Sequence, residues 1–225
     1  MKKNISEPYI SIITPNLNGE KFLEKTIQSV ANQTSKNYEY ILIDGKSTDR
    51  SVEIINKYID NIDTFISEKD ESMYHAINKG IQKAKGEVII WINSDDILDK
   101  NAVLNVSNFF KKNSKVQWIS GINGYIKKNF KFSGIPYVYP RFFLKRGYAD
   151  HALWGFVQQE SVSFRKSLYK KVGGFDYKYN KLCDYGLWVS FSKITFLQTV
   201  FFKIGFFRSW DGQDSKINRL LTFQS

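Results

Sequence analysis

The sequence predicts an α/β fold, in which a Rossmann-like, mostly parallel sheet is flanked by helices within a single domain. One observation is the continuous apolar run Val88–Ile92, which ends abruptly in the polar stretch Asn93–Asp96 and is typical of a strand buried on both faces. Another is that four strand-like segments alternate with three helical patterns in about the first hundred residues, which favours parallel strands joined by helices. The chain also contains no internal repeat and no linker, so one domain is expected over all 225 residues.

The elements of the first half are predicted by the spacing of their apolar residues. Strands are expected where apolar residues alternate or run continuously between polar turns, and helices where they recur every three or four positions. The expected strands are Tyr9–Thr14, Tyr38–Asp44, Asp63–Ser67 and the run that begins at Val88. The expected helices carry apolar faces at Leu23, Ile27 and Val30, at Val52, Ile55 and Ile59, and over Met73–Ala84.

The second half gives weaker patterns. Helices are expected over Asn101–Phe110, Arg165–Val172 and Asp184–Ser192, and strands over Val116–Gly121, Tyr125–Phe132, Ser161–Phe164, Thr195–Lys203 and Gly205–Arg208. Between them, the segment Gly134–Gly155 has no clear period and is rich in aromatic residues. An irregular stretch of this length is more often functional or mobile than structural, although its aromatic side chains could also pack over the sheet.

The composition is that of a soluble globular protein, with 42% hydrophobic and 24% charged residues. Cys183 is the only cysteine, which excludes an intramolecular disulfide and fits a reducing compartment. No apolar stretch approaches a membrane-spanning length, and no apolar signal core precedes the first strand. A cytoplasmic location is therefore expected.

The net charge of +11 is concentrated in one segment of the chain. Residues 101–175 contain thirteen Lys and Arg but two acidic residues, Asp150 and Glu160, so this segment accounts for the whole excess. Such an uneven distribution predicts an anionic partner for the second half of the chain, which could be a membrane surface, a phosphorylated substrate or a nucleic acid.

Polar groups stand at the ends of three predicted strands, at Thr14–Asn16, at Asp44 and at Ser94–Asp96. In a parallel sheet these ends meet at one edge, which is where open α/β sheets bind ligands. Asp44 could accept hydrogen bonds from a base or a ribose. Asp95 and Asp96 repel each other, and a divalent cation on a diphosphate would relieve that repulsion, although an Asp-Asp turn that caps the next helix explains the pair equally simply.

The first strand is not followed by a Gly-x-Gly-x-x-Gly motif, so the pyrophosphate cradle of dinucleotide-binding proteins is absent. A metal ion would then have to neutralise the phosphates of a bound nucleotide. This argues against a dehydrogenase.

Seven motifs of the sequence point to a known family when they are taken together. They are SIITPNLNG (11–19), LIDGKSTDRS (42–51), EKDESMYHAINKG (68–80), GEVIIWINSDD (86–96), QQESVSFRKSLYKKVGGFD (158–176), CDYGLW (183–188) and GQDS (212–215). The chain resembles the inverting family 2 glycosyltransferases, which have the GT-A fold, from Ile10 to about Ser215. It is most similar to the bacterial subgroup that builds capsular, exopolysaccharide and O-antigen chains.

The resemblance implies a role for each matching residue. Pro15, Asn16 and Asp44 would hold the nucleotide, with Asp44 on the base, and Asp70, Asn78 and Lys79 would line the pocket near the base and the diphosphate. Asp96, with help from Asp95, would bind Mn²⁺ or Mg²⁺; Asp184 would be the catalytic base; and Gln159 and Glu160 would lie on the acceptor side. The nucleotide-sugar half would then span about residues 1–100 and the acceptor half about 101–225.

Some of these residues have a simpler interpretation, and some depart from the family pattern. Asn78 and Lys79 could form an ordinary polar helix face, and Asp184 could cap its helix. His75 stands where the subgroup usually has Asp, and Ser72 replaces a usual Gly, which concerns recognition of the sugar or base rather than the reaction class. The Gln-x-x-Arg-Trp motif of the processive synthases is absent, so the transfer of single sugars is expected.

The function expected from the sequence is therefore metal-dependent, inverting transfer of a hexosyl or N-acetylhexosaminyl group from a nucleotide-diphosphate sugar, with UDP as the expected nucleotide. The acceptor would be a saccharide or a lipid-pyrophosphate-linked sugar in the synthesis of cell-surface polysaccharide. Peripheral attachment to the anionic inner face of the cytoplasmic membrane is expected through Lys127, Lys128, Arg141, Lys145 and Arg146.

Two other functions compete with this one. A sugar-phosphate nucleotidyltransferase should carry a glycine-rich, Arg-containing loop after the first strand, and Pro15–Lys21 is not such a loop. A non-catalytic carbohydrate- or nucleic-acid-binding module could use the basic, aromatic half, but it would have no need of three polar strand ends and Asp184. No nucleic acid is expected as a partner.

Overall fold

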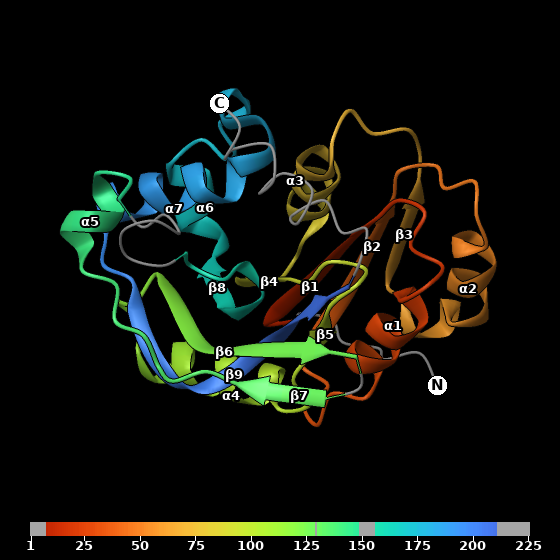
Figure 1. Ribbon diagram of the computed structural model, residues 1–225, viewed down its shortest axis with the longest axis horizontal. Helices are drawn as coiled ribbons and strands as arrows, with labels where there is room; N and C mark the ends of the chain where they lie inside the picture. The colour runs from red at the N-terminus through yellow and green to blue at the C-terminus, as the bar shows by residue number, and fades with distance from the viewer. Residues whose placement is uncertain (1–7, 129, 149–155, 211–225) are drawn as a thin grey trace.

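The computed structural model describes residues 8–128, 130–148 and 156–210, and these form one curled sheet with helices on both of its faces (Figure 1). Within these residues the sheet has nine strands in the order β3-β2-β1-β4-β8-β6-β9-β5, and β7 pairs with β6. Asp150 and the Gly212–Ser215 motif lie outside the described residues.

The first half is a parallel α/β unit, as predicted. Its strands are β1 (Ile10–Asn16), β2 (Tyr38–Asp44), β3 (Thr64–Ser67) and β4 (Val88–Trp91), and its helices are α1 (Leu23–Ala31), α2 (Ser51–Lys57), the short 3₁₀ helix η1 (Ile59–Asn61) and α3 (Met73–Lys83). β1 lies at the centre, and it pairs in parallel with β2 and β4. Each of the seven predicted elements of this half is present within a few residues of its expected bounds.

The second half makes the sheet mixed. Its strands are β5 (Ile97–Leu98), β6 (Trp118–Lys127), β7 (Phe130–Ser133), β8 (Val162–Arg165) and β9 (Gln198–Ser209). Its helices are α4 (Ala102–Lys112), α5 (Arg141–Lys145), η2 (Gln159–Ser161), α6 (Lys166–Lys171), η3 (Tyr177–Leu182) and α7 (Cys183–Ile194). β8 runs antiparallel to both β4 and β6, and β5 and β7 also pair in antiparallel, whereas β6 pairs in parallel with β9. The sheet as a whole is therefore mixed.

Two strand predictions in the second half were wrong in their bounds. Residues 116–132 form the long strand β6 and a hairpin with β7, rather than two strands broken before Tyr125. Residues 195–208 contain the single strand β9 instead of two strands. The physical reason lies in glycine: a Cβ on Gly124 would lie 2.6 Å from the Phe206 ring, and one on Gly205 would lie 2.5 Å from the Glu160 carbonyl oxygen. These glycines allow close backbone approach and do not end the strands.

The core consists of two layers of buried side chains, one on each face of the sheet. Helices α1, α2 and α4 cover one face, and α3, α6 and α7 cover the other (Figure 1). Neighbouring residues of β1 show the alternation expected for a strand buried on both sides, because Ile12 packs into the first layer and Ile13 into the second. No described helix is both long enough and apolar enough to cross a membrane.

Candidate active site

The polar ends of the central strands lie at one edge of the sheet, as the sequence predicts. Asn16 at the end of β1 is paired with Asp44 at the end of β2. On the other side of β1, β4 ends at Trp91, which is paired with Ile13, and the chain continues into the acidic turn Asn93–Asp96. Two carboxylate-bearing segments therefore flank the end of β1.

The Asp44 carboxylate is completely buried and is surrounded by hydrogen-bond donors. Asn16 Nδ2 donates to Oδ1 (2.8 Å), Ser67 Oγ donates to Oδ2 (2.7 Å), and Ser47 donates to Oδ1 through its hydroxyl and to Oδ2 through its backbone N–H. Burial by itself raises the pKa of Asp44, but these hydrogen bonds outweigh it and hold the pKa below its ordinary value. Asp44 is thus charged at neutral pH, with about four acceptor positions in use.

Pro15 and Asn16 are buried in β1 beside this carboxylate. Asn16 Nδ2 also lies 3.1 Å from Ser47 Oγ, whereas its Oδ1 is buried without a hydrogen-bond partner in the described part of the chain. A Cβ on Gly19 would lie 2.2 Å from that oxygen, so only glycine leaves room at this position. Pro15 has no polar side-chain atom, and it precedes Asn16 in β1.

The second cluster is built on Asp96, which is also completely buried. Its Oδ1 accepts a hydrogen bond from the Arg208 backbone N–H (2.7 Å), and its Oδ2 accepts one from Asn93 Nδ2 (3.3 Å). Burial, and then the charges of Glu160 and Asp95, raise the pKa of Asp96 well above its ordinary value. Burial also raises the pKa of Glu160, to about 7, and the two side chains are hydrogen-bonded to each other. A carboxyl–carboxyl hydrogen bond requires a proton, so this pair holds one near neutral pH.

Asp95 is the more accessible member of the acidic turn, because it is partly exposed whereas Asp96 is not. Its Oδ2 accepts a hydrogen bond from Trp210 Nε1 (2.9 Å), and its backbone carbonyl accepts one from Arg208 Nε (2.7 Å). The prediction made Asp96 the main metal ligand and Asp95 its helper. In the structure, Asp95 is the more accessible of these two carboxylates, and the assignment of the main ligand stays a prediction.

Gln159 fixes the acidic turn from the other side. Its Nε2 donates to the Trp91 carbonyl (2.6 Å), and its Oε1 accepts from Asn93 Nδ2 (3.1 Å). Trp91 Nε1 in turn donates to Asn93 Oδ1 (2.8 Å). Gln159 and Glu160 are both buried, with 6% and 5% of their surface exposed, so the structure places them behind the acidic turn and not on an open acceptor surface.

Asp184 lies in the first turn of α7, on the same side of the sheet as α3. Tyr74 Oη lies 3.0 Å from Asp184 Oδ1 and 3.0 Å from the Lys181 carbonyl oxygen. Burial raises the pKa of Asp184, although the Tyr185 backbone N–H and the Tyr74 hydroxyl lower it in part. The cap position of α7 is Leu182, which makes no side-chain cap hydrogen bond, so Asp184 is not the helix cap.

Four carboxyl groups meet in this neighbourhood, because the charges of Asp95 and Asp184 both act on Glu160, which contacts Asp96. In the described part of the chain, no three His, Cys, Asp or Glu side chains form a group that would hold a metal ion by themselves. The neighbouring pair Asp95 and Asp96 remains. One or two carboxylates completed by substrate phosphates are the ligands that Mg²⁺ usually takes, so the residues present fit a metal bound together with a diphosphate.

The other predicted pocket residues, Asp70, Asn78 and Lys79, do not form a single group. Lys79 Nζ lies 2.6 Å from Asp70 Oδ1 and 2.6 Å from Glu68 Oε1, and Asp70 Oδ2 is buried without a hydrogen-bond partner among the described residues. Asn78 instead accepts a hydrogen bond from Tyr169 Oη on α6 (3.0 Å). Asp70 and Lys79 therefore form one polar group, and Asn78 joins α3 to α6 apart from it.

Several residues of the site were not singled out from the sequence. Ser47 and Asn93 lie in the same motifs as Asp44 and Asp96, so the sequence could have indicated them as neighbours of these aspartates. Tyr74 also lies in a motif, but its contact with Asp184 spans 110 positions. Arg208 lies 112 positions from Asp96 and contacts it through its backbone, and no local pattern announces such a contact.

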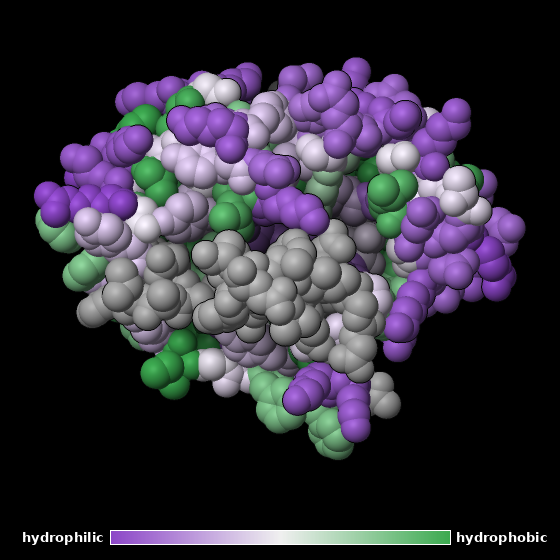
Figure 2. Space-filling view, turned by 45° about the horizontal axis from the view of Figure 1, so that its top comes forward, coloured by the Kyte–Doolittle hydropathy of each residue, from purple (hydrophilic) through white to green (hydrophobic). Residues whose placement is uncertain are grey.

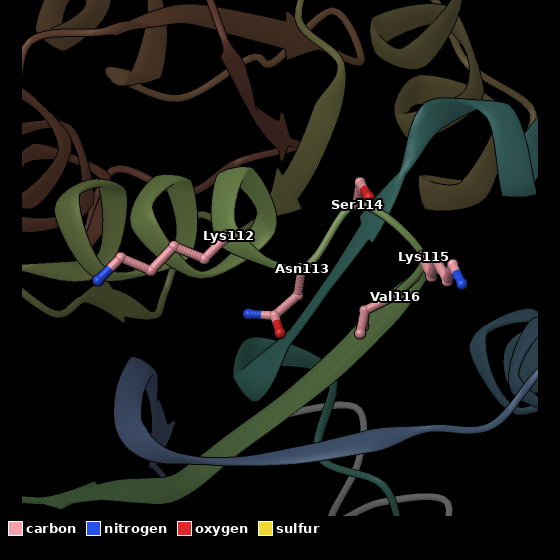
Figure 3. A pocket seen from close by; sticks show the side chains of 5 residues that line it. All are labelled: Lys112, Asn113, Ser114, Lys115 and Val116. Atoms are coloured by element: carbon pink, nitrogen blue, oxygen red, sulfur yellow. The ribbon is translucent and has the colours of Figure 1, made fainter.

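A shallow hollow lined by residues 112–116 lies elsewhere on the molecule (Figure 3). It is near the amino-terminal end of β4, because Arg165, which donates to the Asn113 carbonyl, is paired with Val88. Figure 3 shows that the side chains of Lys112 and Lys115 point away from each other. No set of polar groups converges in this hollow, so the strand-end cluster is the candidate active site.

Comparisons with known proteins show to which family the chain is similar. The model of the family described as "Glycosyl transferase family 2" matches residues 11–173, which include all of β1 but its first residue, β2, the acidic turn and Glu160. A glycosyltransferase named for PGL/p-HBAD biosynthesis, from Mycobacterium bovis, is 26% identical over 185 residues, which are 80% of this chain and 68% of that protein. An uncharacterized glycosyltransferase from Haemophilus influenzae is 39% identical over 112 residues, or 48% of this chain and 45% of that protein.

Solved structures share the fold. S. aureus TarS (1–349) in complex with UDP-GlcNAc superposes with a TM-score of 0.71 at 15% identity, over 92% of this chain and 60% of that one. The mannosyltransferase PcManGT from Pyrobaculum calidifontis, in complex with GDP-Man and Mn²⁺, gives a TM-score of 0.63 at 18% identity, over 92% of this chain and 58% of that one. The chain thus matches GT-A structures, and it spans less than two thirds of the length of several proteins to which it is similar.

Proposed function

The chain belongs to glycosyl transferase family 2, and from this premise we propose that it transfers one sugar from a nucleotide-diphosphate sugar to a hydroxyl acceptor, with inversion at the anomeric carbon. The observation that carries the proposal is the convergence of Asp44, Asp95, Asp96 and Asp184 from three separate segments, the end of β2, the acidic turn and the start of α7. A donor needs recognition of its nucleotide, neutralisation of its diphosphate and a base for the acceptor, and these carboxylates offer one group for each need.

The nucleotide would bind at the Asp44 side. The charged Asp44 carboxylate can accept a hydrogen bond from a base N–H, and the buried Asn16 and the Asp70–Lys79 pair lie on the same half of the sheet. We propose UDP as the nucleotide because TarS is solved with UDP and with UDP-GlcNAc, whereas GDP-Man in PcManGT makes a guanine donor the alternative. A base that binds Asp44 has to replace one of the serine hydroxyls that now occupy it.

A divalent cation, Mn²⁺ or Mg²⁺, would be held by Asp95 with the negative potential of Asp96 and Glu160 behind it. When bound, it would stabilise the charge that develops on the leaving diphosphate. Mn²⁺ in PcManGT supports a metal in a protein of this fold. Arg208 and Trp210 hold the backbone and the side chain of Asp95, so the direction of its carboxylate is set before the donor arrives.

Asp184 would act as the general base. It takes the proton of the acceptor hydroxyl while the hydroxyl oxygen attacks the anomeric carbon from the face opposite the leaving diphosphate, which gives inversion. Its raised pKa makes it a stronger base than an ordinary aspartate, and the Tyr74 hydrogen bond orients it. Glu160 is buried against Asp96, so its carboxyl group is less accessible to an acceptor than that of Asp184.

The acceptor we propose is a saccharide, either free or carried on a lipid pyrophosphate, in the assembly of a cell-surface polysaccharide. The acceptor would bind to the second half of the chain, about residues 101–225, which includes α5, α6 and α7. The expectation that Gln159 and Glu160 contact the acceptor is not part of the proposal, because both side chains are buried.

The test is a screen of nucleotide sugars by thermal shift with and without Mn²⁺ or Mg²⁺, followed by an assay of UDP release. A metal-dependent rise in the melting temperature with one nucleotide sugar is expected, because a ligand that binds the folded state stabilises it. Release of inorganic pyrophosphate from a sugar phosphate and UTP would instead identify a nucleotidyltransferase. Binding of saccharides without any effect of nucleotide or metal would identify a carbohydrate-binding module.

A further inference from the structure

The hairpin of β6 and β7 carries exposed aromatic and basic side chains that the proposed reaction does not use. Phe130, Phe132 and Tyr125 are 70%, 54% and 42% exposed. Lys127 and Lys128, beside the turn of the hairpin, are exposed as well. We call these five residues the hairpin surface. Single exposed apolar residues are common on proteins, but a group of them rimmed by charge marks an interaction site.

Strand register places most of this surface on one face of the hairpin. Tyr125 is opposite Phe132, and Lys127 is opposite Phe130, in the antiparallel pair. Residues directly opposite each other share a face, and so do residues two apart in one strand. Ile126, which lies between Tyr125 and Lys127, is buried in a small core on the other face. The hairpin surface is therefore the outward face, and its two phenyl rings lie 6.5 Å apart.

The lysines of the hairpin surface form no ion pair with an acidic residue in the described ranges. Other basic residues of the segment 101–175 are engaged in the fold. Arg141 donates to the Ser192 and Lys193 carbonyls, and Arg165 is buried and paired with Glu87. The predicted basic face is thus divided by the structure: Arg141 stabilises the contact of α5 with α7, and the hairpin lysines remain available to an external anion.

The hairpin surface lies next to the candidate active site. In the sheet, Ile126 is paired with Arg208 and Lys127 with Ser209, and the Arg208 N–H is bound to Asp96. The last residues of β6 and the first residues of β7 therefore lie at the end of the sheet at which the acidic turn lies. Figure 2 shows green and purple side chains alternating along the lower edge of the molecule, the edge at which Figure 1 places β7.

We propose that the hairpin surface docks on a lipid bilayer that contains anionic headgroups. The phenyl rings would enter the boundary between headgroups and acyl chains, and the two ammonium groups would pair with lipid phosphates. Docked in this way, the chain would present the acidic turn to an acceptor anchored in the same bilayer. Only this last consequence rests on the proposed function; the docking itself does not depend on catalysis.

A second copy of the chain is the competing occupant of this surface. β7 pairs with β6 alone in the described part of the sheet, so its outer edge could extend another sheet. Charge argues for the bilayer, because Lys127 and Lys128 of one copy would approach those of the other in a symmetric pairing, whereas they complement anionic lipid.

The experiment is co-sedimentation of the full chain with vesicles of phosphatidylcholine alone or with 30 mol% phosphatidylglycerol added, at low and high salt. Two variants change the hairpin surface, Phe130→Ser with Phe132→Ser, and Lys127→Gln with Lys128→Asn, since asparagine tolerates the positive φ of residue 128. Two matched controls lie elsewhere on the surface, Leu104→Ser, at a side chain that is 40% exposed, and Lys25→Gln with Lys83→Gln. Circular dichroism checks that every variant is folded.

Salt-sensitive binding to the anionic vesicles is expected, and each hairpin variant should bind about tenfold more weakly or worse while the controls bind as the wild type does. Absence of binding at low salt, or equal loss in the control variants, would overturn the proposal. A dimer in analytical ultracentrifugation that is abolished by Phe130→Ser with Phe132→Ser, without vesicle binding, would assign the surface to a second copy. Because no substrate is added, the result is independent of whether the chain transfers sugar.

Discussion

Asp44 and Asp96 are both completely buried aspartates at the same edge of one sheet, yet their electrostatic states are opposite. Asp44 receives hydrogen bonds from Asn16, Ser47 and Ser67, and its pKa is lowered. Asp96 lies against another carboxyl group, Glu160, and its pKa is raised. Burial raises the pKa of both, so the difference comes from the partners that each carboxylate meets.

The comparison separates two uses of a buried acid. A carboxylate with all its acceptor positions filled is stable as an anion, and it can recognise a ligand only by exchanging one donor for another. A pair of carboxyl groups that share a proton carries unsatisfied negative potential, which a cation can neutralise. On this basis the Asp44 side suits a neutral base with N–H groups, and the Asp96–Glu160 side suits a metal ion or another positive charge.

The largest effect is expected at Asp184, the acid that belongs to neither class because it is partly exposed and has the Tyr74 hydroxyl beside it. Asp184→Asn removes the proton acceptor and little volume, so transfer should fall about 10²- to 10⁴-fold while donor affinity stays unchanged. Steady-state rates and calorimetry of donor binding measure the two quantities. Tyr74→Phe is the matched variant, and a smaller fall is expected from it because the base is kept.

The pH dependence sharpens the assignment. The pKa of Asp184 is raised, and a base acts in its deprotonated form, so kcat should rise with pH through a value above the ordinary aspartate range. If Asp184→Asn transfers sugar at the wild-type rate, the base is another group.

The next effect concerns the two aspartates of the acidic turn. Asp95→Asn should lower the affinity for the donor in the presence of Mn²⁺ by about 100-fold, and Asp96→Asn by about tenfold, because the first removes a direct ligand and the second a neighbour that supports it. Calorimetry with the nucleotide sugar, with metal and with EDTA, gives both values. The order of the two losses is the decisive result: a greater loss in Asp96→Asn would return the role of main ligand to Asp96.

The sequence was informative about the parallel half because that half depends on local patterns. The apolar run before Asn93 and the periodicity of Met73–Ala84 each follow from burial of a strand or of one helix face, and both were found as predicted. The convergence of Asp44 with the acidic turn also followed, since parallel strands end at a common edge.

The rest of the site could not be predicted from local patterns, because its contacts join distant segments through backbone atoms. The Arg208 N–H that binds Asp96 has no residue-type signature, and the buried state of Glu160 depends on β9 crossing behind it, where Gly205 permits the close approach. Which of Asp95 and Asp96 is more accessible depends on the orientation of the acidic turn, which the sequence does not determine. Neighbouring aspartates look alike in sequence and differ in burial.

A smaller effect is expected from the shared proton of Asp96 and Glu160. The pKa of Glu160 is raised to about 7, so the protonated side chain stabilises the folded state relative to the ionised one. This contribution to the free energy of unfolding is complete below the ordinary glutamate pKa and is lost as the pH rises through about 7. The metal-free protein should therefore melt at a lower temperature at pH 8 than at pH 6. Glu160→Gln cannot ionise and should melt at a higher temperature than the wild type at pH 8. The exposed Glu53→Gln is the control, and an equal pH dependence in the wild type and Glu160→Gln would show that Glu160 does not titrate between pH 6 and pH 8.

The smallest expected effect concerns Ser67, and it tests whether this hydrogen-bond donor of Asp44 stabilises the fold or contacts the nucleotide. Ser67→Ala removes one hydrogen bond to Asp44 Oδ2 and leaves the Asn16 and Ser47 donors in place. The variant should lose about 1 kcal/mol in the free energy of unfolding, which is typical of one hydrogen bond at a partly exposed position. Its affinity for the nucleotide should not decrease, because an oxygen of Asp44 is released for the base.

Ser114→Ala, at an exposed serine near the end of α4, controls for the substitution itself. Chemical denaturation and calorimetry with UDP give the two numbers. A loss of UDP affinity in Ser67→Ala that exceeds its loss of stability would mean that the serine hydroxyl itself contacts the nucleotide, and that Asp44 serves to orient it.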